Sequence, residues 1–213
     1  MHQVTLYHYW RSSCSWRVRW ALAIKKIKYQ DVAINLLKNE QRSPQYLSVN
    51  PSGLVPTLAI DGMHLSESLA IIEYLEESFP GKAALLPQDR RKRARIREFA
   101  NMLMTIQSVQ NLRVLKRHSN DLHERQRWAK EVIEEGLEAV EEKLRQSAGT
   151  YCFGGQVSMA DLFLIPQIYN AHRFKINMNQ FPICQRIYQH CLTTHECELA
   201  APHNQPGAIN PAP

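Results

Sequence analysis

The sequence predicts two unlike domains, an α/β domain followed by an all-helical one. Over the first 80 residues, the patterns follow the order strand, helix, strand, and then strand, strand, helix. A break follows at Phe79-Pro80-Gly81 and Leu85-Leu86-Pro87, after which the periodicity is helical almost throughout. We therefore expect an α/β domain over residues 1–83 and an all-α domain over residues 88–213.

The first half has the pattern of a βαβ unit followed by a β hairpin and a helix. An amphipathic stretch separates the first two strand-like stretches, so these strands should be parallel and joined by a helical crossover. Asp61-Gly62 favours a two-residue type I′ turn, which predicts an antiparallel hairpin around it. The expected elements are a strand over 4–9, a helix over 15–26, strands over 29–36, 55–60 and 63–65, and a helix over 68–78.

The second half should be a set of helices. Ser158-Met-Ala-Asp161 is a capping-box pattern, in which two side chains satisfy backbone donors at a helix start. Residues 202–213 contain four prolines and no apolar pattern, so we expect them to be draped over the surface or disordered. The expected helices cover 90–118, 122–146, 162–172 and 183–192. The second of these predicts a solvated acidic face made of Glu131, Glu134, Glu135, Glu138, Glu141 and Glu142.

Composition excludes several classes of protein. The chain has 213 residues with 44% apolar side chains, enough for two modest cores, but no apolar run is long enough to span a bilayer. The first 25 residues carry Arg11, Arg17, Arg19 and Lys25, which do not fit a secretory signal, so we expect a cytoplasmic protein with no membrane partner. The five cysteines lack metal-type spacing and predict reduced thiols without a metal site.

The net charge of +6 is concentrated in the second half. Its excess begins with Arg90-Arg91-Lys92-Arg93, Arg95 and Arg97, a cluster that could indicate nucleic-acid binding or an import signal. Because the cluster lies on a helical pattern without interleaved aromatic residues, we interpret it as a solvated or subunit-facing surface and expect no nucleic-acid partner. A basic protein also suits a small substrate with several carboxylates.

The segment between the first strand and the first helix carries the most informative chemistry. Serine is a common N-cap, and Ser13 or Ser15 is expected to have that role. A helix N-terminus also offers N–H groups and the positive end of the dipole, which favour a bound anion such as a thiolate. A serine hydroxyl within reach of that sulfur would favour the ionised form further. The segment reads Arg11-Ser12-Ser13-Cys14-Ser15-Trp16-Arg17-Val18-Arg19.

This segment resembles the Ser-Ser-Cys-Ser-Trp-Arg-Val-Arg signature of zeta-class glutathione transferases, the class of the maleylacetoacetate isomerases. The resemblance runs from about residue 4 to residue 210. It implies the glutathione transferase fold, in which a thioredoxin-like domain precedes an all-α domain. Further segments that resemble the family, in the same order, are Asn50-Pro51, Val55–Leu58, Ser68–Leu75, Leu86–Asp89, Gln110–Leu112, Met159–Leu162 and Arg173–Lys175.

The resemblance implies that glutathione is the cofactor and that Ser12, Ser13 and Cys14 are the catalytic residues. Val55 would pair its backbone with the cysteinyl part of glutathione, ahead of a cis peptide bond before Pro56. The implied glutathione contacts are Ser12, Ser13, Cys14, Ser15, Trp16, Arg17, Gln41, Val55, Glu67, Ser68, Gln107, Asn111, Leu112 and Arg113.

Two positions depart from the family pattern. Glu67 stands where the family has Gln, which keeps an acceptor for the glutathione ammonium but removes an amide donor. Arg113 replaces a residue that is often small and polar. By the same resemblance, Arg11 and Arg173 would bind substrate carboxylates, for which a planar guanidinium is well suited. A salt bridge or a solvent-exposed arginine is the alternative for Arg173.

The implied activity is the glutathione-dependent cis–trans isomerisation of maleylacetoacetate to fumarylacetoacetate, in tyrosine and phenylalanine catabolism, by a homodimer. Alternatives within the fold are maleylpyruvate isomerisation and a broader transferase or dehalogenase activity on small α-halo acids. A thiol transferase would use Cys14 as a redox nucleophile, but the intact serine pair argues against it. A non-catalytic interaction module would bind through the basic cluster, but retention of the serine and cysteine loop argues against that.

Overall fold

The computed structural model describes residues 3–209, which divide into two compact units. The first unit holds the described residues up to Ala84 together with those from Thr194 onward, and the second is Leu85–Thr193. This division differs from the expected second domain over 88–213, because the last segment packs with the first unit. There α9 (His195–Ala200) packs on α1 (Ser13–Ile24), and the guanidinium of buried Arg19 donates to the Ala200 carbonyl.

The first unit is an α/β domain. Its remaining elements are β1 (Val4–His8), β2 (Gln30–Ala33), η1 (Glu40–Arg42), α2 (Pro44–Val49), β3 (Thr57–Ile60), β4 (Met63–Ser66), α3 (Ser68–Ser78) and η3 (Pro202–Asn204). The strand order is β2-β1-β3-β4, with β1 parallel to β2 and antiparallel to β3, and β3 antiparallel to β4. The expected βαβ unit and hairpin are both present, and the φ angles of Asp61 and Gly62 are positive, 50° and 76°, as a type I′ turn requires.

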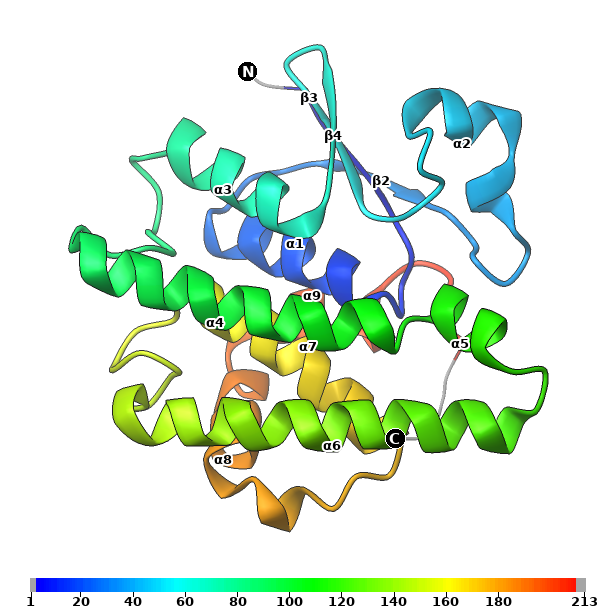
Figure 1. Ribbon diagram of the computed structural model, residues 1–213. Helices are drawn as coiled ribbons and strands as arrows, with labels where there is room; N and C mark the ends of the chain where they lie inside the picture. The colour runs from blue at the N-terminus through cyan, green and yellow to red at the C-terminus, as the bar shows by residue number, and fades with distance from the viewer. Residues whose placement is uncertain (1–2, 210–213) are drawn as a thin grey trace. The chain divides into compact units, whose positions relative to one another are not determined.

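The core of this unit lies between the sheet and two helices. Figure 1 shows α1 and α3 side by side next to the sheet, and their contact is extensive. Burial alternates along β1, which indicates that one face of the sheet is covered. Leu6 and Leu58, paired across β1 and β3, are fully buried, as are Leu22 of α1 and Ile71 of α3.

Short elements of this unit were not expected from the sequence. α2 and α9 have six residues each, fewer than two helical turns, so an apolar period of 3.6 cannot show itself. Of the two alternatives for the tail, the part up to residue 209 fits the draped segment. Pro202–Asn204 forms a 3₁₀ turn, and the Gln205 amide donates to the carbonyls of Leu199 and Ala201. Residues 210–213 lie outside the described part of the chain.

The second unit is helical throughout its described elements, which are α4 (Arg90–Val109), α5 (Leu112–His118), α6 (Leu122–Ser147), α7 (Met159–Arg173), η2 (Met178–Gln180) and α8 (Pro182–Leu192). α7 is its core helix: it packs on α4 and α8 and is buried from Met159 to Ile168. In Figure 1, α7 lies between the long helices α4 and α6. The capping box is present, with Ser158 and Asp161 bonding as expected. Asp161 also accepts a hydrogen bond from the Cys152 backbone.

Two expectations for this unit were wrong. The helix expected over 90–118 is interrupted, because the Asn111 side chain accepts from the backbone N–H groups of Arg113 and Val114 and so starts a new helix. Glu141 is not part of a solvated face. It is buried and accepts hydrogen bonds from the backbone of Ile183 and Cys184 at the start of α8.

Candidate active site

Ser12, at the start of α1, is the serine that caps the helix. Its Oγ accepts from the Ser15 backbone N–H at 3.2 Å, so the expectation that Ser13 or Ser15 is the cap was wrong. Ser15 is fully buried and its Oγ accepts instead from the Tyr9 backbone at 3.4 Å, while Ser13 is buried in the first turn. A hydroxyl that accepts one bond still has its own proton to donate. Ser12 can therefore cap the helix and donate to an anion at the same time.

Arg17 joins the segment Arg11–Cys14, which we call the thiol loop, to the start of α3. Its side chain is buried, and Nη1 lies 3.7 Å from Cys14 Sγ and 3.3 Å from Ser68 Oγ. Burial lowers the pKa of Arg17 and the neighbouring Cys14 opposes that shift. A guanidinium in this position places positive charge between the two segments that the sequence assigned to glutathione.

The N-terminus of α3 is arranged to receive an anion. Glu67 is its N-cap residue, with a φ of 69°, and its exposed side chain makes no capping hydrogen bond. A non-glycine residue in this region costs on the order of 1–3 kcal/mol, so the surrounding structure must impose the conformation. The first N–H groups of α3 thus have no side-chain cap from Glu67, and with Arg17 nearby they suit a carboxylate.

The loop that carries Val55 is held by a buried polar network. The Val55-Pro56 peptide bond is cis, as the resemblance implied. Tyr46 Oη donates to the Leu54 carbonyl and lies 3.0 Å from Thr57 Oγ1. Asn50 Nδ2 donates to the same two acceptors at 3.0 Å. The residues on both sides of the cis bond are therefore fixed by side chains from α2 and the turn after it.

The remaining sequence-predicted residues of the first unit lie in different settings. Trp16 is 1% exposed, so its indole belongs to the core. The Arg11 guanidinium lies over the Trp10 ring at 5.3 Å from the centroid. Gln41 is in η1 and its Oε1 is buried without a hydrogen-bond partner in the structure. The structure thus links Ser12, Cys14 and Ser68 through α1, while Arg11 lies in the turn before α1 and Gln41 lies in η1.

In the second unit, two of the sequence-predicted residues share one network. Gln107 Oε1 accepts from Gln110 Nε2 at 3.0 Å and from Asn170 Nδ2 at 3.2 Å. Arg173 Nη1 donates to Asn170 Oδ1 at 3.0 Å. Asn170 is buried, and it orients an arginine whose side chain is otherwise exposed, so Gln107 and Arg173 form parts of one polar chain along α4 and α7.

The other three residues predicted in this unit lie at the start of α5, with Asn111 as its N-cap. Asn111 uses its carbonyl for capping and donates its amide to the Ser108 carbonyl at 2.6 Å. Leu112 and Arg113 are exposed at the start of the helix. The described side-chain contacts of Asn111 are thus structural.

Sequence reasoning missed the supporting residues of these groups. Tyr46, Asn50 and Asn170 all bond to segments that the sequence singled out, but none carries a charge, and although Asn50 belongs to the family-like pair Asn50-Pro51, that pair did not reveal its supporting role. Arg19 is different: it stands in the apolar run Val18-Arg19-Trp20-Ala21-Leu22, and a charge amid buried apolar residues is a signal of an interior ion with dedicated partners.

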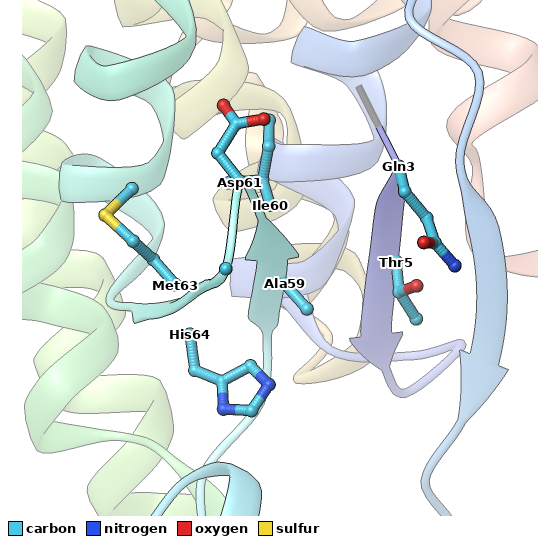
Figure 2. A pocket seen from close by; sticks show the side chains of 8 residues that line it. Gln3, Thr5, Ala59, Ile60, Asp61, Met63 and His64 are labelled. Carbon is cyan, nitrogen blue, oxygen red and sulfur yellow. The ribbon is translucent and has the colours of Figure 1, made fainter. Parts of the chain in front are cut away.

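A surface hollow of about 470 Å³ lies beside the β3–β4 hairpin, and it is lined by residues of β1, β3, β4 and the hairpin turn. Figure 2 shows Thr5, Ala59 and His64 on adjacent strands along it. None of the sequence-predicted site residues lines it, and Asp61, which does, already accepts from Tyr74 Oη at 2.9 Å. We therefore do not assign the site to this hollow.

Within residues 3–209 no cluster of three or more histidine, cysteine or acidic residues could hold a metal ion. In the same part of the chain, no helix is both long enough and apolar enough to cross a bilayer.

Comparison with known families gives a consistent result over both units. Residues 2–77 match the model of the glutathione S-transferase N-terminal domain, and residues 91–187 match the model of the glutathione S-transferase C-terminal domain. The maleylacetoacetate isomerase of Dictyostelium discoideum is 46% identical over 213 aligned residues, which cover 97% of each chain.

Solved structures are also similar. The maleylacetoacetate isomerase of Anaeromyxobacter dehalogenans, determined with glutathione bound in its active site, superposes with a TM-score of 0.90 at 37% identity, covering 98% of this chain and 99% of the other. A maleylpyruvate isomerase, described as a bacterial zeta-class glutathione transferase, superposes with a TM-score of 0.92 at 33% identity, covering 96% and 100%. The similarity extends over nearly the whole chain in each case.

Proposed function

The chain belongs to the glutathione S-transferase family, and from that premise we propose that it is a zeta-class, glutathione-dependent isomerase that converts maleylacetoacetate to fumarylacetoacetate. The name of the relative with 46% identity supports this substrate. The observation that carries the chemistry is the position of Ser12, whose hydroxyl caps α1 and keeps a proton to donate at the helix N-terminus.

The residues of the first unit fit glutathione. The uncapped start of α3, with Ser68 and the adjacent Arg17 charge, suits the carboxylate of the γ-glutamyl end. Glu67 offers an acceptor for the ammonium group of the same end. Val55, held ahead of the cis bond, presents backbone groups to the cysteinyl part. When bound, glutathione supplies the thiolate nucleophile that makes a cis double bond labile to rotation and is then returned unchanged.

The chain's own residues have three tasks in this scheme. Ser12 donates a hydrogen bond to the sulfur and, with the α1 dipole, favours its ionised form. Arg17 adds positive charge beneath the loop without contacting solvent, and Cys14 fills space beside it. Arg11 and Arg173 bind substrate carboxylates, and Asn170 orients Arg173 through its Oδ1.

Maleylpyruvate is the second candidate substrate. The specific observation in its favour is the TM-score of 0.92 to a maleylpyruvate isomerase. Both substrates are small diketo acids with a cis double bond, so the same thiol loop serves either. Turnover of purified protein with maleylacetoacetate and with maleylpyruvate, each with and without glutathione, tests the proposal. A kcat/KM for maleylpyruvate that exceeds the value for maleylacetoacetate would reassign the substrate, and absence of turnover with both would refute the isomerase function.

We further propose that the first unit is the glutathione-binding domain and the helical unit contributes the substrate arginine Arg173. The protein is proposed to act as a homodimer in the cytoplasm, in tyrosine and phenylalanine catabolism. The family as a whole supports these assignments. The exposed basic residues Arg90, Arg91, Lys92 and Arg95 are then available as a subunit-facing surface.

A further inference from the structure

We propose that Arg19 is a positioning residue for the thiol loop, because its guanidinium holds the turn that ends at Ser12 and so sets the direction of the Ser12 hydroxyl. The inference rests on the proposed function, since it concerns the same sulfur site. It adds a residue that touches neither glutathione nor substrate and acts through the backbone of Tyr9 and Trp10.

Within residues 3–209, the hydrogen-bond partners of the Arg19 side chain belong to the first unit. The side chain is 1% exposed. Nη2 donates to the Trp10 carbonyl at 3.1 Å, and Nη1 donates to the Tyr9 carbonyl at 3.4 Å. Nε donates to the Ala200 carbonyl at 3.0 Å. Two of these three carbonyls belong to the turn that leads directly into Ser12, and the third is at the end of α9.

The Tyr9 carbonyl is shared between Arg19 and the loop itself. It also accepts from the Ser12 backbone N–H at 3.0 Å, while the Tyr9 N–H donates to Ser15 Oγ. Ser12 in turn accepts from the Ser15 N–H. The backbone of the turn is thus held from the interior by Arg19 and from the helix by Ser15, and a shift of the Tyr9 carbonyl would be passed to Ser12 through one hydrogen bond.

His8 fixes the orientation of the guanidinium. Its Nδ1 lies 3.1 Å from Arg19 Nη1, and arginine can only donate, so Nδ1 accepts and the ring proton is on Nε2. That proton is donated to Asp31 Oδ1 at 2.8 Å. Burial lowers the pKa of Arg19 to about 9, which leaves the guanidinium charged at neutral pH. The chain of hydrogen bonds from Asp31 through His8 therefore fixes the orientation in which the Arg19 guanidinium donates to the carbonyls of Tyr9 and Trp10.

Only an arginine can satisfy this arrangement. The acceptors lie in different directions around the group: three carbonyls and one imidazole nitrogen. A guanidinium offers five N–H donors in a fixed planar fork, whereas a lysine ammonium offers three donors from a single atom. Arg19→Lys keeps the charge and removes the fork, which makes it the sharpest test.

The experiment compares wild-type protein with Arg19→Lys, using Lys25→Met as a matched control. Lys25, the C-cap residue of α1, is also buried and also donates to a carbonyl, that of Ala83, besides pairing with Glu76. Amide hydrogen exchange of Ser12 and Ser15 is measured in ligand-free protein. The ultraviolet absorbance of bound glutathione is titrated to obtain the pKa of its thiol, and kcat is recorded against pH.

For Arg19→Lys we expect exchange at Ser12 and Ser15 to rise about tenfold and the bound thiol pKa to rise by about one unit, which lowers the thiolate fraction about tenfold below that pKa. The loss of kcat should diminish as the pH rises. Lys25→Met should lower the unfolding temperature and leave both loop readouts unchanged. An Arg19→Lys protein with lower thermal stability but wild-type exchange and thiol pKa would show that Arg19 is merely structural.

A second variant covers the case in which Arg19→Lys does not fold. Asp31→Ala removes the acceptor that fixes the His8 tautomer, and Asp31 is partly exposed, so the change perturbs Arg19 without emptying the core. It should shift exchange at Ser12 in the same direction, about threefold. Unchanged exchange at Ser12 in folded Asp31→Ala would overturn the proposal. Because exchange is measured without ligand, these outcomes are distinct from failure of the proposed function, which would show as wild-type protein that neither binds glutathione nor turns over either substrate.

Discussion

Replacing Ser12 by alanine should have two separable effects, because the same hydroxyl caps α1 and is proposed to donate to the glutathione sulfur. The cap is the bond from the Ser15 N–H to Ser12 Oγ at 3.2 Å. Replacing a serine N-cap with alanine costs about 1 kcal/mol of stability. A protein stable by 5 kcal/mol or more remains over about 99% folded after that loss, so the cap does not by itself lower activity.

The second effect is on turnover. Loss of one donor aimed at developing negative charge costs about 2.7–4 kcal/mol, or roughly 100- to 1,000-fold in kcat. We therefore expect Ser12→Ala to lose at least about 100-fold in isomerase kcat while it still binds glutathione. Binding is retained because the start of α3 and the Val55 backbone provide other anchors.

Ser12→Gly separates the two effects. Glycine at an N-cap costs only a few tenths of a kcal/mol relative to serine, so this variant should be nearly as stable as wild type. It lacks the hydroxyl and should be as inactive as Ser12→Ala. Asp121→Ala is a matched control, since Asp121 caps α6 by accepting from the His123 N–H at 2.8 Å, and this variant should lose stability but keep its turnover.

The assays are urea unfolding, glutathione binding by calorimetry, and kcat with maleylacetoacetate. Near-normal turnover in Ser12→Ala would refute the reasoning and move the thiolate role to Ser13 or Cys14. If kcat instead falls in proportion to the free energy of unfolding across Ser12→Ala, Ser12→Gly and Asp121→Ala, the hydroxyl acts only as a cap.

Four further outcomes are expected. Cys14→Ala should keep most cis–trans activity, because the attacking sulfur belongs to glutathione; complete loss of activity together with a glutathione adduct on wild-type Cys14 by intact mass would refute this. Burial, followed by the Arg19 charge, lowers the pKa of His8 below its usual 6.5. The unfolded chain then takes up a proton that the folded chain does not, so the stability from neutral His8 is present above pH 6.5 and is lost as the pH falls toward the lowered pKa; urea unfolding against pH should show this slope in wild type and not in His8→Gln. Gly136→Ala should lower the urea midpoint, because its Cβ would lie 2.4 Å from Cδ1 of buried Ile106, and overpacking costs about 1–3 kcal/mol. Ile106 Cγ1 would lie at the same distance, so Ile106→Ala, which deletes both atoms, should abolish the added loss caused by Gly136→Ala in a double-mutant cycle, and a raised midpoint in Gly136→Ala would contradict the argument. Sedimentation at micromolar concentration should show a dimer, and a stable monomer would contradict the proposed homodimer.

The order of the larger elements could be predicted because their patterns are local. α3 begins and ends where expected, at Ser68 and Ser78, since its apolar residues repeat with a helical period and the hairpin before it has a strong turn signal. The hairpin depends on Asp61-Gly62, whose positive φ angles are intrinsic to the dipeptide. The glutathione transferase fold was confirmed by the family models over both units.

The expectations that failed concern competition between side chains for backbone donors. Asn111 lies in a continuous helical pattern, and nothing in the pattern reveals that its side chain accepts two N–H groups and starts α5. In sequence, Glu141 resembles its neighbours on α6. Its side chain nevertheless caps α8, where its Oε1 accepts from the backbone N–H of Ile183, 42 residues further along the chain. The choice of Ser12 over Ser13 or Ser15 as the cap depends on φ and ψ at a single residue. Such choices are made by tertiary context.

The return of the chain to its first unit has a consequence for biosynthesis. Arg19 is synthesised first, and its Nε acceptor, the Ala200 carbonyl, is added 181 residues later. Until then a buried guanidinium donor has no partner, which is costly in a protein interior. A nascent chain truncated before α9 should therefore protect its α/β part poorly from proteolysis. In ribosome-bound chains of increasing length, each followed by a linker that spans the exit tunnel, residues 4–33 should become protected only when Ala200 is included. Residues that follow the whole helical unit in sequence would thus complete the first unit.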